Sequence, residues 1–163
     1  MEALKIYERV WERFPDKVLE VSDKKPDPFA VVAPDAIVSI SRFLHDDPET
    51  ATDCLSNETG ADYKDRIEVV YHLFSYKHHH GCVLKVKLPR DNPAVASVEE
   101  VWRAANWMER EIFDLLGVSF DGHSDLRRIL MPEEFTAFPL RKDYPLRGRG
   151  ERHNFPRLTR GES

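Results

Sequence analysis

Apolar residues recur every three or four positions in two stretches near the amino end of the chain, which predicts two amphipathic helices. The first helix is expected over residues 4–14 and the second over residues 34–47, and a proline closes each of them. Their apolar stripes consist of Leu4, Tyr7, Trp11 and Phe14 in the first helix and of Ile37, Ile40 and Leu44 in the second.

Strands are predicted between and after these helices. Short apolar runs at residues 18–21 and 29–32 flank a segment rich in turn-forming residues, which predicts two strands. Residues 53–57 predict a further short strand, and residues 60–65 are expected to be a loop.

The clearest strands come next. Residues 66–76 are rich in β-branched and aromatic side chains and are apolar on both faces, so they are expected to form a central strand covered on both sides. Residues 82–88 alternate apolar and basic positions, which is typical of a strand with one wet face. Residues 77–81 would join the two as a hairpin.

A third helix is predicted by a capping box at Ser97 and Glu100 and by Gly117, which supplies a carboxyl-terminal stop. Its expected apolar stripe consists of Val101, Ala105, Met108, Ile112 and Leu115. Helices before and after a run of strands indicate an α+β fold, in which a mixed or antiparallel sheet packs with helices.

Beyond Gly117 the pattern changes to single apolar residues among charged ones, and Pro132, Pro139 and Pro145 forbid a long helix. Such a ribbon is not expected to bury itself, although it carries much apolar surface. The apolar residues include Phe120, Leu126, Ile129, Leu130, Met131, Phe135, Phe138, Leu140, Tyr144 and Leu146. We therefore expect an α+β domain over residues 1–117 and an extended, partner-binding segment with a basic tail over residues 118–163.

Composition limits the alternatives. A chain of 163 residues is expected to form one core, and without an apolar run of about 20 residues or a signal peptide it is expected to be soluble and cytoplasmic. Cys54 and Cys82 are too few for the four thiolates that an iron–sulfur cluster usually takes. The net charge of the chain is −5; residues 141–163 contribute +4 and residues 1–140 contribute −9.

The basic tail allows three interpretations. It could be a solvated terminus, or it could dock on an acidic protein surface, because Phe155, Pro156 and Leu158 alternate with its arginines. Nucleic acid is disfavoured as a partner, since the acidic body of the chain would repel phosphate.

Three consecutive histidines, His78, His79 and His80, raise the question of a metal site. Successive strand residues point to opposite faces, so the three cannot all reach one ion without a special turn. A solvated hairpin tip is the favoured interpretation, and a metal site or a pH or redox switch are the alternatives. The sequence shows no recognisable motif for a nucleotide, a flavin or a metal.

Charged residues gather on the third helix at Glu109, Arg110, Glu111 and Asp114. Arg110 and Asp114 lie one turn apart and could pair. Trp102 and Trp107 lie outside the apolar stripe, so more than solvent is expected to contact this helix. The favoured interpretation is that the carboxylates anchor the ribbon by holding Arg127, Arg128 or groups of a partner.

His123 follows a glycine and is expected to hydrogen-bond the turn before a helical turn at residues 126–130. A role in proton transfer is the alternative. The carboxylates of the third helix also leave acid–base catalysis open, but paired carboxylates without a pocket are a weak signal.

Residues 109–146 closely resemble the signature of the C-subunit family of the proton-pumping NADH:quinone oxidoreductase, respiratory complex I, which is shared with related membrane-bound dehydrogenases and hydrogenases. The matching residues are Glu109, Arg110, Glu111, Asp114, Leu115, Gly117, Gly122, His123, Asp125, Leu126, Arg127, Arg128, Ile129, Leu130, Pro132, Glu133 and the run P-L-R-K-D-Y-P-L at 139–146. Ser124 replaces the family's usual proline, and Ala137 with Phe138 replaces a Gly-His pair. Phe138 is therefore expected to fill an apolar recess at an interface.

The resemblance implies a non-catalytic structural subunit in the hydrophilic arm, peripheral to the cytoplasmic face of the cell inner membrane. It implies contact with the large quinone-site subunit and neighbouring cluster-bearing subunits, no direct contact with the membrane, and no cofactor in this chain; FMN and iron–sulfur clusters belong to the complex. The expected structural or partner-binding residues are Glu109, Arg110, Glu111, Asp114, His123, Asp125, Arg127, Arg128, Pro132, Phe138, Arg141, Lys142, Asp143 and Tyr144.

Two other functions remain open at this point. The first is a free-standing acid–base enzyme that uses Glu109, Glu111, Asp114 and His123. The second is a regulatory or nucleic-acid-binding module that acts through the basic tail, for which binding to polyanions would depend strongly on salt.

Overall fold

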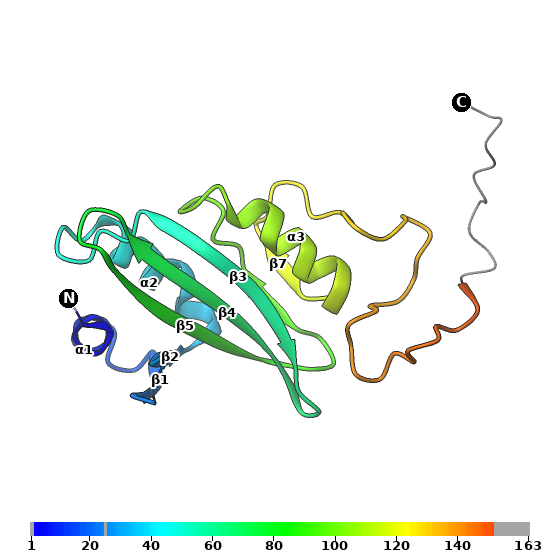
Figure 1. The fold of residues 1–163 in the computed structure, drawn as a ribbon, viewed down its shortest axis with the longest axis horizontal. Helices are drawn as coiled ribbons and strands as arrows, with labels where there is room; N and C mark the ends of the chain where they lie inside the picture. Colours follow the sequence, from blue (N-terminus) through cyan, green and yellow to red (C-terminus); the bar gives the residue numbers. More distant parts are fainter. Residues whose placement is uncertain (1, 25, 152–163) are drawn as a thin grey trace.

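Five strands form one mixed sheet in the order β1-β2-β5-β4-β3 (Figure 1). The computed structural model describes residues 2–24 and 26–151. The strands are β1 (Val18–Ser22), β2 (Phe29–Val32), β3 (Cys54–Asp62), β4 (Arg66–Ser75) and β5 (His80–Pro89). Strands β2 and β5 pair in parallel, and the other neighbours pair antiparallel. The predicted α+β class with a mixed sheet is confirmed.

Three α-helices contribute to a single core with one face of this sheet: α1 (Ala3–Arg13), α2 (Ile37–Asp46), which follows a 3-10 turn at Pro34–Ala36, and α3 (Ala105–Leu116). Strand β5 shows why one face is used. Cys82, Leu84, Val86 and Leu88 are buried in the core, whereas Lys85 and Lys87 point to the other face. The predicted wet face of this strand and the predicted first two helices are confirmed.

Two predictions about the strands are wrong. Strand β4 is an interior strand between β5 and β3, as predicted, but it is not covered on both faces, because its burial alternates from Val69 onward. Strand β3 extends through residues 60–62, where a loop was expected. The polar residues of β3 concealed it, and Gly60 has a packing role: a side chain there would collide with Leu116 of α3.

Helix α3 begins later than the capping box indicated. The helix starts at Ala105, and Ser97 instead accepts a hydrogen bond from the N–H of Glu99 at 3.1 Å. The buried face of α3 also differs from the predicted stripe, because it includes the charged residues Glu109, Arg110 and Asp114. These buried charges mark α3 as the candidate functional element.

A two-stranded parallel sheet, formed by β6 (Ala94–Ala96) and β7 (Ser119–Asp121), was not predicted. The expectation that the chain after Gly117 has no core of its own is therefore wrong for Val118 and Phe120, which are buried in the main core. The division of the chain into domains at residue 117 remains a prediction.

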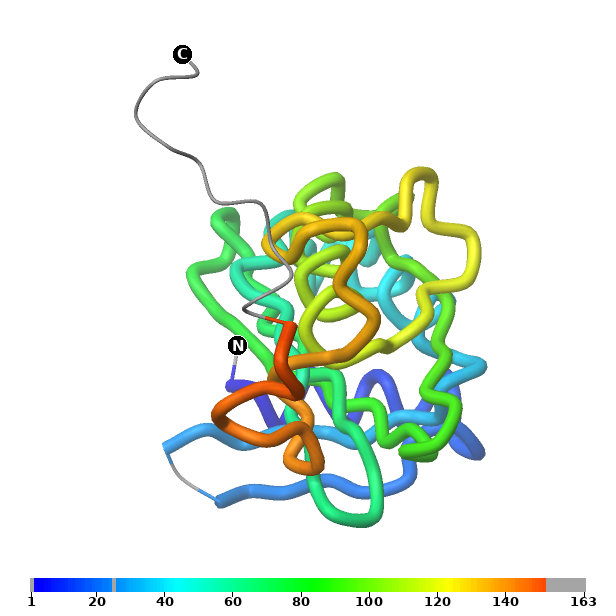
Figure 2. The backbone as a smooth tube through the Cα atoms, turned by 90° about the vertical axis from the view of Figure 1, so that its right-hand side faces the viewer, coloured from blue at the N-terminus to red at the C-terminus, as the bar shows by residue number. Residues whose placement is uncertain are grey.

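Residues 122–151 contain no α-helix or β-strand and run past the carboxyl-terminal end of α3 (Figure 2). The expected helical turn at residues 126–130 is wrong, because residues 126–128 have no regular structure and residues 129–130 form only a bend. We call residues 122–151 the anchored segment. Within the described part of the chain, no helix is long and apolar enough to cross a bilayer.

Candidate functional site

Asp114 is the main attachment point of the anchored segment. Its side chain is fully buried, and its Oδ1 atom lies 2.6 Å from the guanidinium of Arg128. Its Oδ2 atom accepts the backbone N–H groups of Ile129, Leu130 and Met131 at 3.0, 2.7 and 2.8 Å. Burial favours the neutral acid, but these donors outweigh it and hold the pKa of Asp114 below its usual range.

Arg128 extends this attachment. It donates to the carbonyls of Asp114 and Ala137 at 3.1 and 3.2 Å, and its guanidinium lies over the rings of Phe135 and Phe138. The predicted anchoring of Arg128 by a helix carboxylate is thereby confirmed. One buried charge pair fixes a chain that has no ladder of backbone hydrogen bonds.

The other predicted arginine contacts are different. Arg110 was expected to pair with Asp114, but it donates to the carbonyls of Arg127 and Arg128 at 3.2 and 3.3 Å. Arg127 was expected to meet a helix carboxylate, but it pairs with the exposed Asp125 at 2.9 Å. Arg110 therefore supports the same segment through its backbone.

Residues 138–141 close the carboxyl-terminal end of α3. Arg141 donates to the carbonyl of Leu116 at 2.6 Å, and the N–H of Leu140 donates to the carbonyl of Leu115 at 3.0 Å. Such bonds satisfy carbonyls that a helix end leaves without partners. The ring of Phe138 covers Gly117, which is left-handed with a φ of 71°. Phe138 thus packs on Gly117 and Phe113 of its own chain, and its contact with a partner stays a prediction.

A second attachment point involves residues that the sequence reasoning missed. Asp62, at the end of β3, is paired with Arg90 at 2.9 Å and accepts the N–H of Lys142 at 2.7 Å. Arg90 also contacts Asp143 at 3.1 Å. The Arg90 guanidinium lowers the pKa of Asp62. Only an extended β3 places Asp62 at this position, so the mistaken loop prediction hid it.

The remaining predicted residues of this segment lie near its surface. Pro132 is exposed, and its carbonyl accepts the N–H of Phe135 at 3.0 Å. The ring of Tyr144 lies 5.9 Å from that of Phe135. Phe155, Pro156 and Leu158, on which the docking of the tail was predicted, lie outside the described residues.

Glu109 lies on the buried face of α3 one turn before Asp114 and has a different environment. It accepts the hydroxyl of Ser97 at 2.6 Å and the N–H of Val98 at 2.7 Å. Burial exceeds the effect of these donors and raises the pKa of Glu109 to about 7.

His123 hydrogen-bonds its own turn, as predicted. The N–H of Asp125 donates to Nδ1 at 2.9 Å, and Nε2 lies 3.0 Å from the carbonyl of Asn106. These two contacts assign the proton of the neutral ring to Nε2. His123 thus joins the start of the anchored segment to the amino-terminal end of α3.

The carboxylates of α3 do not converge on one reaction site. Glu111 is exposed, which corrects the expectation that it would pair with an arginine; with Glu58, Met108 and Leu140 it borders an open hollow of about 270 Å³. Asp114 is saturated by donors, and Glu109 points into the interior. A nucleophile or substrate would have no common place beside all three.

The histidines of the hairpin are partly built into the fold. His80 is buried, with Nε2 2.9 Å from the carbonyl of Thr50, and the ring of His78 stacks on it. The expected solvated tip is therefore wrong for His80. Among the described residues no group of three side chains of the metal-binding types is placed to hold an ion.

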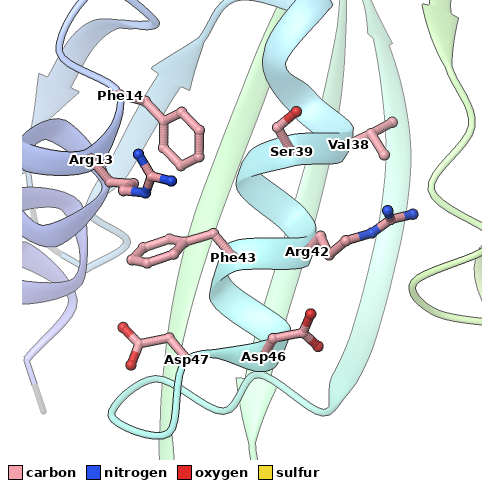
Figure 3. Close-up of a pocket in the computed structure, with 8 residues that line it drawn as sticks. All are labelled: Arg13, Phe14, Val38, Ser39, Arg42, Phe43, Asp46 and Asp47. Atoms are coloured by element: carbon pink, nitrogen blue, oxygen red, sulfur yellow. The ribbon is translucent and has the colours of Figure 1, made fainter.

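An open hollow of about 720 Å³ lies between α1 and α2 (Figure 3). Arg13 and Phe14, at the end of α1, line it together with Phe43 and Asp47, at the end of α2 (Figure 3), and the rings of Phe14 and Phe43 are in edge contact at 5.8 Å. None of the predicted site residues lines this hollow, so it does not gather the chemistry expected of the acid–base enzyme.

Comparison with known proteins identifies the kind of fold to which this arrangement belongs. The structure of a trypsin-resistant fragment (1–134) of Nqo5 superposes with a TM-score of 0.60 at 26% identity and covers 74% of this chain and 99% of that chain. A chain of the membrane-bound sulfane sulfur reductase, an archaeal respiratory membrane complex, superposes with a TM-score of 0.74 at 24% identity, covering 98% of this chain and 96% of that chain. The second likeness concerns the fold alone.

Sequence relatives define the family. The chain is 46% identical over 141 residues to the NADH-quinone oxidoreductase C subunit of Roseiflexus castenholzii, covering 85% of this chain and 81% of that one. It is 38% identical over 141 residues to the C subunit of the same enzyme in Geobacter sulfurreducens, covering 84% and 86%. Residues 30–150 match the family described as "Respiratory-chain NADH dehydrogenase, 30 Kd subunit". The chain belongs to this family, as the resemblance predicted.

Proposed function

We propose that this chain is a non-catalytic structural subunit in the hydrophilic arm of complex I, the NADH-quinone oxidoreductase. Membership in the 30 Kd subunit family supports its place as a subunit of that enzyme. The observation that carries the structural role is the anchored segment, which Asp114 and Asp62 hold on the domain through backbone N–H groups.

The anchored segment presents apolar side chains outward. Leu130, Leu140 and Leu146 are 61%, 59% and 104% exposed. The backbone N–H groups of Leu130 and Leu140 are nevertheless held by hydrogen bonds to α3. An apolar surface of this kind on a well-attached segment suits a permanent protein interface. We infer that its partners are the large quinone-site subunit and neighbouring cluster-bearing subunits.

In this proposal the chain carries no cofactor. Electrons pass from NADH through FMN and iron–sulfur clusters of other subunits to quinone, while the assembly translocates protons. The chain reaches the cytoplasmic face of the membrane only through the complex. The acid–base enzyme has no support from the separate positions of Glu109, Glu111 and Asp114, and binding of nucleic acid has no support from the relatives.

The decisive experiment is to purify the native assembly through an affinity tag on this chain and to identify its companions. We expect the subunits of an NADH-quinone oxidoreductase and NADH-dependent quinone reduction by the purified material. Recovery of the tagged chain alone, or with proteins unrelated to this enzyme, would contradict the proposal.

The interface itself can be tested with matched substitutions. Leu130→Asp places a charge on the anchored segment, and Leu19→Asp places the same charge on β1, at the opposite edge of the sheet from β3, with an equal exposure of 61%. Leu130→Asp should lower the yield of assembled complex, and Leu19→Asp should lower it less. Equal yields would show that Leu130 does not face a partner.

A further inference from the structure

Glu58 is a buried carboxyl group that the anchoring of the segment does not use. Its side chain is 5% exposed, and within the described part of the chain neither of its carboxyl oxygens has a hydrogen-bond partner. Tyr71 lies directly opposite it on β4, and the hydroxyl of Tyr71 is likewise buried without a hydrogen-bond partner there. Unsatisfied polar atoms in a core are costly, so their retention calls for an explanation.

Helix α3 brings a second carboxyl group to the same place. Glu58 and Gly60 lie two positions apart on β3 and therefore share a face, and Ile112 and Leu116 of α3 pack directly on Gly60. Glu109 lies on the same buried stripe of α3, one turn before Ile112. Glu58 and Glu109 consequently face each other across the contact between helix and sheet, close enough for each charge to act on the other.

The surroundings offer little positive charge to this pair. In the described part of the chain, neither carboxylate has a salt bridge to a lysine or an arginine. The titratable groups that face the pair are Tyr71 from β4, His123 from the anchored segment and Glu99 from the turn before α3. The exposed Glu111 of α3 borders the same hollow as Glu58. The Nε2 atom of His123 lies 3.9 Å from Glu109 and 3.6 Å from Glu99.

We propose that Glu58 and Glu109 form a proton-binding site, in which the pair retains one proton at neutral pH and this proton stabilises the contact between α3 and β3. Two buried carboxylates without a lysine or arginine partner cannot both ionise without a large cost. Glu109 has two hydrogen-bond donors, from Ser97 and Val98, and is therefore the member that ionises first as the pH rises. Glu58 has none and holds the proton.

The electrostatics support this division. Burial, followed by the charge of Glu109, raises the pKa of Glu58 well above its usual range. His123 and Glu99 connect the pair to solvent, because the Glu99 side chain is partly exposed beside a surface hollow that also includes Asn106 and Ser124. A proton can therefore exchange with water without the opening of the core.

The sign of the pH dependence follows from linkage. A carboxyl group whose pKa is raised by folding binds its proton more tightly in the folded state, so the folded chain loses stability as the pH rises from the unfolded pKa toward the folded one. While only the folded state holds this proton, the unfolding equilibrium constant should rise by up to about tenfold per pH unit. This loss therefore begins just above the unfolded pKa and continues until the pH passes the raised pKa of the folded chain.

Infrared spectroscopy of the purified full-length chain in heavy water tests the proposal, because a neutral carboxyl group has a C=O stretching band that a carboxylate lacks. The wild-type chain should show this band at neutral pH. Above the pKa of Glu109, where that group is ionised, the wild-type band should persist and Glu58→Gln should remove it, whereas Glu111→Gln, an exposed glutamate of α3, should leave it unchanged. Glu58→Gln should also flatten the fall in stability with rising pH.

Two results would overturn the proposal. The first is the absence of a neutral carboxyl band from the wild-type spectrum at neutral pH, a measurement that needs no variant to fold. The second is a band that persists in folded Glu58→Gln above the pKa of Glu109. Neither result depends on whether the chain assembles into complex I, so failure here is distinct from failure of the proposed function.

Discussion

Helix α3 buries two carboxyl groups five residues apart, those of Glu109 and Asp114, and their surroundings shift the two pKa values in opposite directions. Near the carboxyl-terminal end, Asp114 meets a guanidinium and three N–H groups, and its pKa is lowered. Near the amino-terminal end, Glu109 meets two donors and lies across from the unpartnered Glu58, and its pKa is raised. Both side chains are fully buried.

The difference shows that the exposure of the side chain alone does not decide the charge of these two acids, because both are fully buried and their hydrogen-bond donors differ. Burial acts on both groups in the same direction and raises their pKa values. Four donors reverse that effect at Asp114, and two donors do not at Glu109. One helix can therefore hold a permanent anion for attachment and a carboxyl group that titrates near neutral pH.

The strongest test of this contrast is Asp114→Ala. The substitution leaves Arg128 partly buried without its partner and releases three N–H groups, at a cost of about 3–5 kcal/mol to the attachment of the segment. Amide hydrogen exchange at residues 129–131 of the isolated chain should accelerate by more than about a hundredfold. The control is Asp125→Ala, which removes the exposed pair with Arg127 and should leave those amides unchanged. Similar exchange in both variants would refute the role of Asp114.

Gly117→Ala tests the packing at the same end of the helix. It adds a side chain at a φ of 71° and forces Phe138 away, so the expected loss is roughly 2–3 kcal/mol in the free energy of unfolding. Gly122→Ala is a matched control with a φ of 84° and no neighbour within 4 Å of the added atom, and it should cost about 1–2 kcal/mol. Equal losses in urea titrations would mean that Phe138 does not pack on Gly117 in solution.

Acid should affect the carboxyl groups of Asp114 and Glu109 differently. The expected change in stability is smaller than for Asp114→Ala or Gly117→Ala, because acid only adds a proton. The pKa of Asp114 is lower when folded, so its contribution is present above its unfolded pKa and is lost as the pH falls through the folded value. Glu109, whose pKa is raised to about 7, is already protonated above this range, and its protonation does not weaken the fold. Stability curves of wild type and Asp114→Asn should therefore converge in acid, and parallel curves would contradict this.

The smallest effect is expected at Glu111, which shares α3 with both groups but is exposed. Glu111→Gln should change the free energy of unfolding of the isolated chain by less than about 0.5 kcal/mol. Thermal unfolding can measure this. A loss comparable with that of Asp114→Ala would mean that Glu111 belongs to a buried pair after all.

The sequence predicted some parts of the fold and of the candidate site better than others, for physical reasons. Helices α1 and α2 and strand β5 have clear periodicity, and the anchoring of Arg128 followed from the need of an irregular segment for a buried charge pair. Strand β3 was predicted to end at residue 57 and a loop to begin at residue 60, because polar residues and a glycine interrupt the apolar pattern there, although side chains from α3 cover Gly60. That error also concealed Asp62 and Glu58, whose roles depend on contacts with distant parts of the chain.

The backbone character of the Asp114 contacts has a consequence for evolution. Asp114 binds the N–H groups of Ile129, Leu130 and Met131, and every residue type except proline offers that group. The side chain at Leu130 is exposed and can change without loss of the attachment. Substitutions there can adapt the surface to changes in a partner protein, while Asp114 keeps the backbone of residues 129–131 in place.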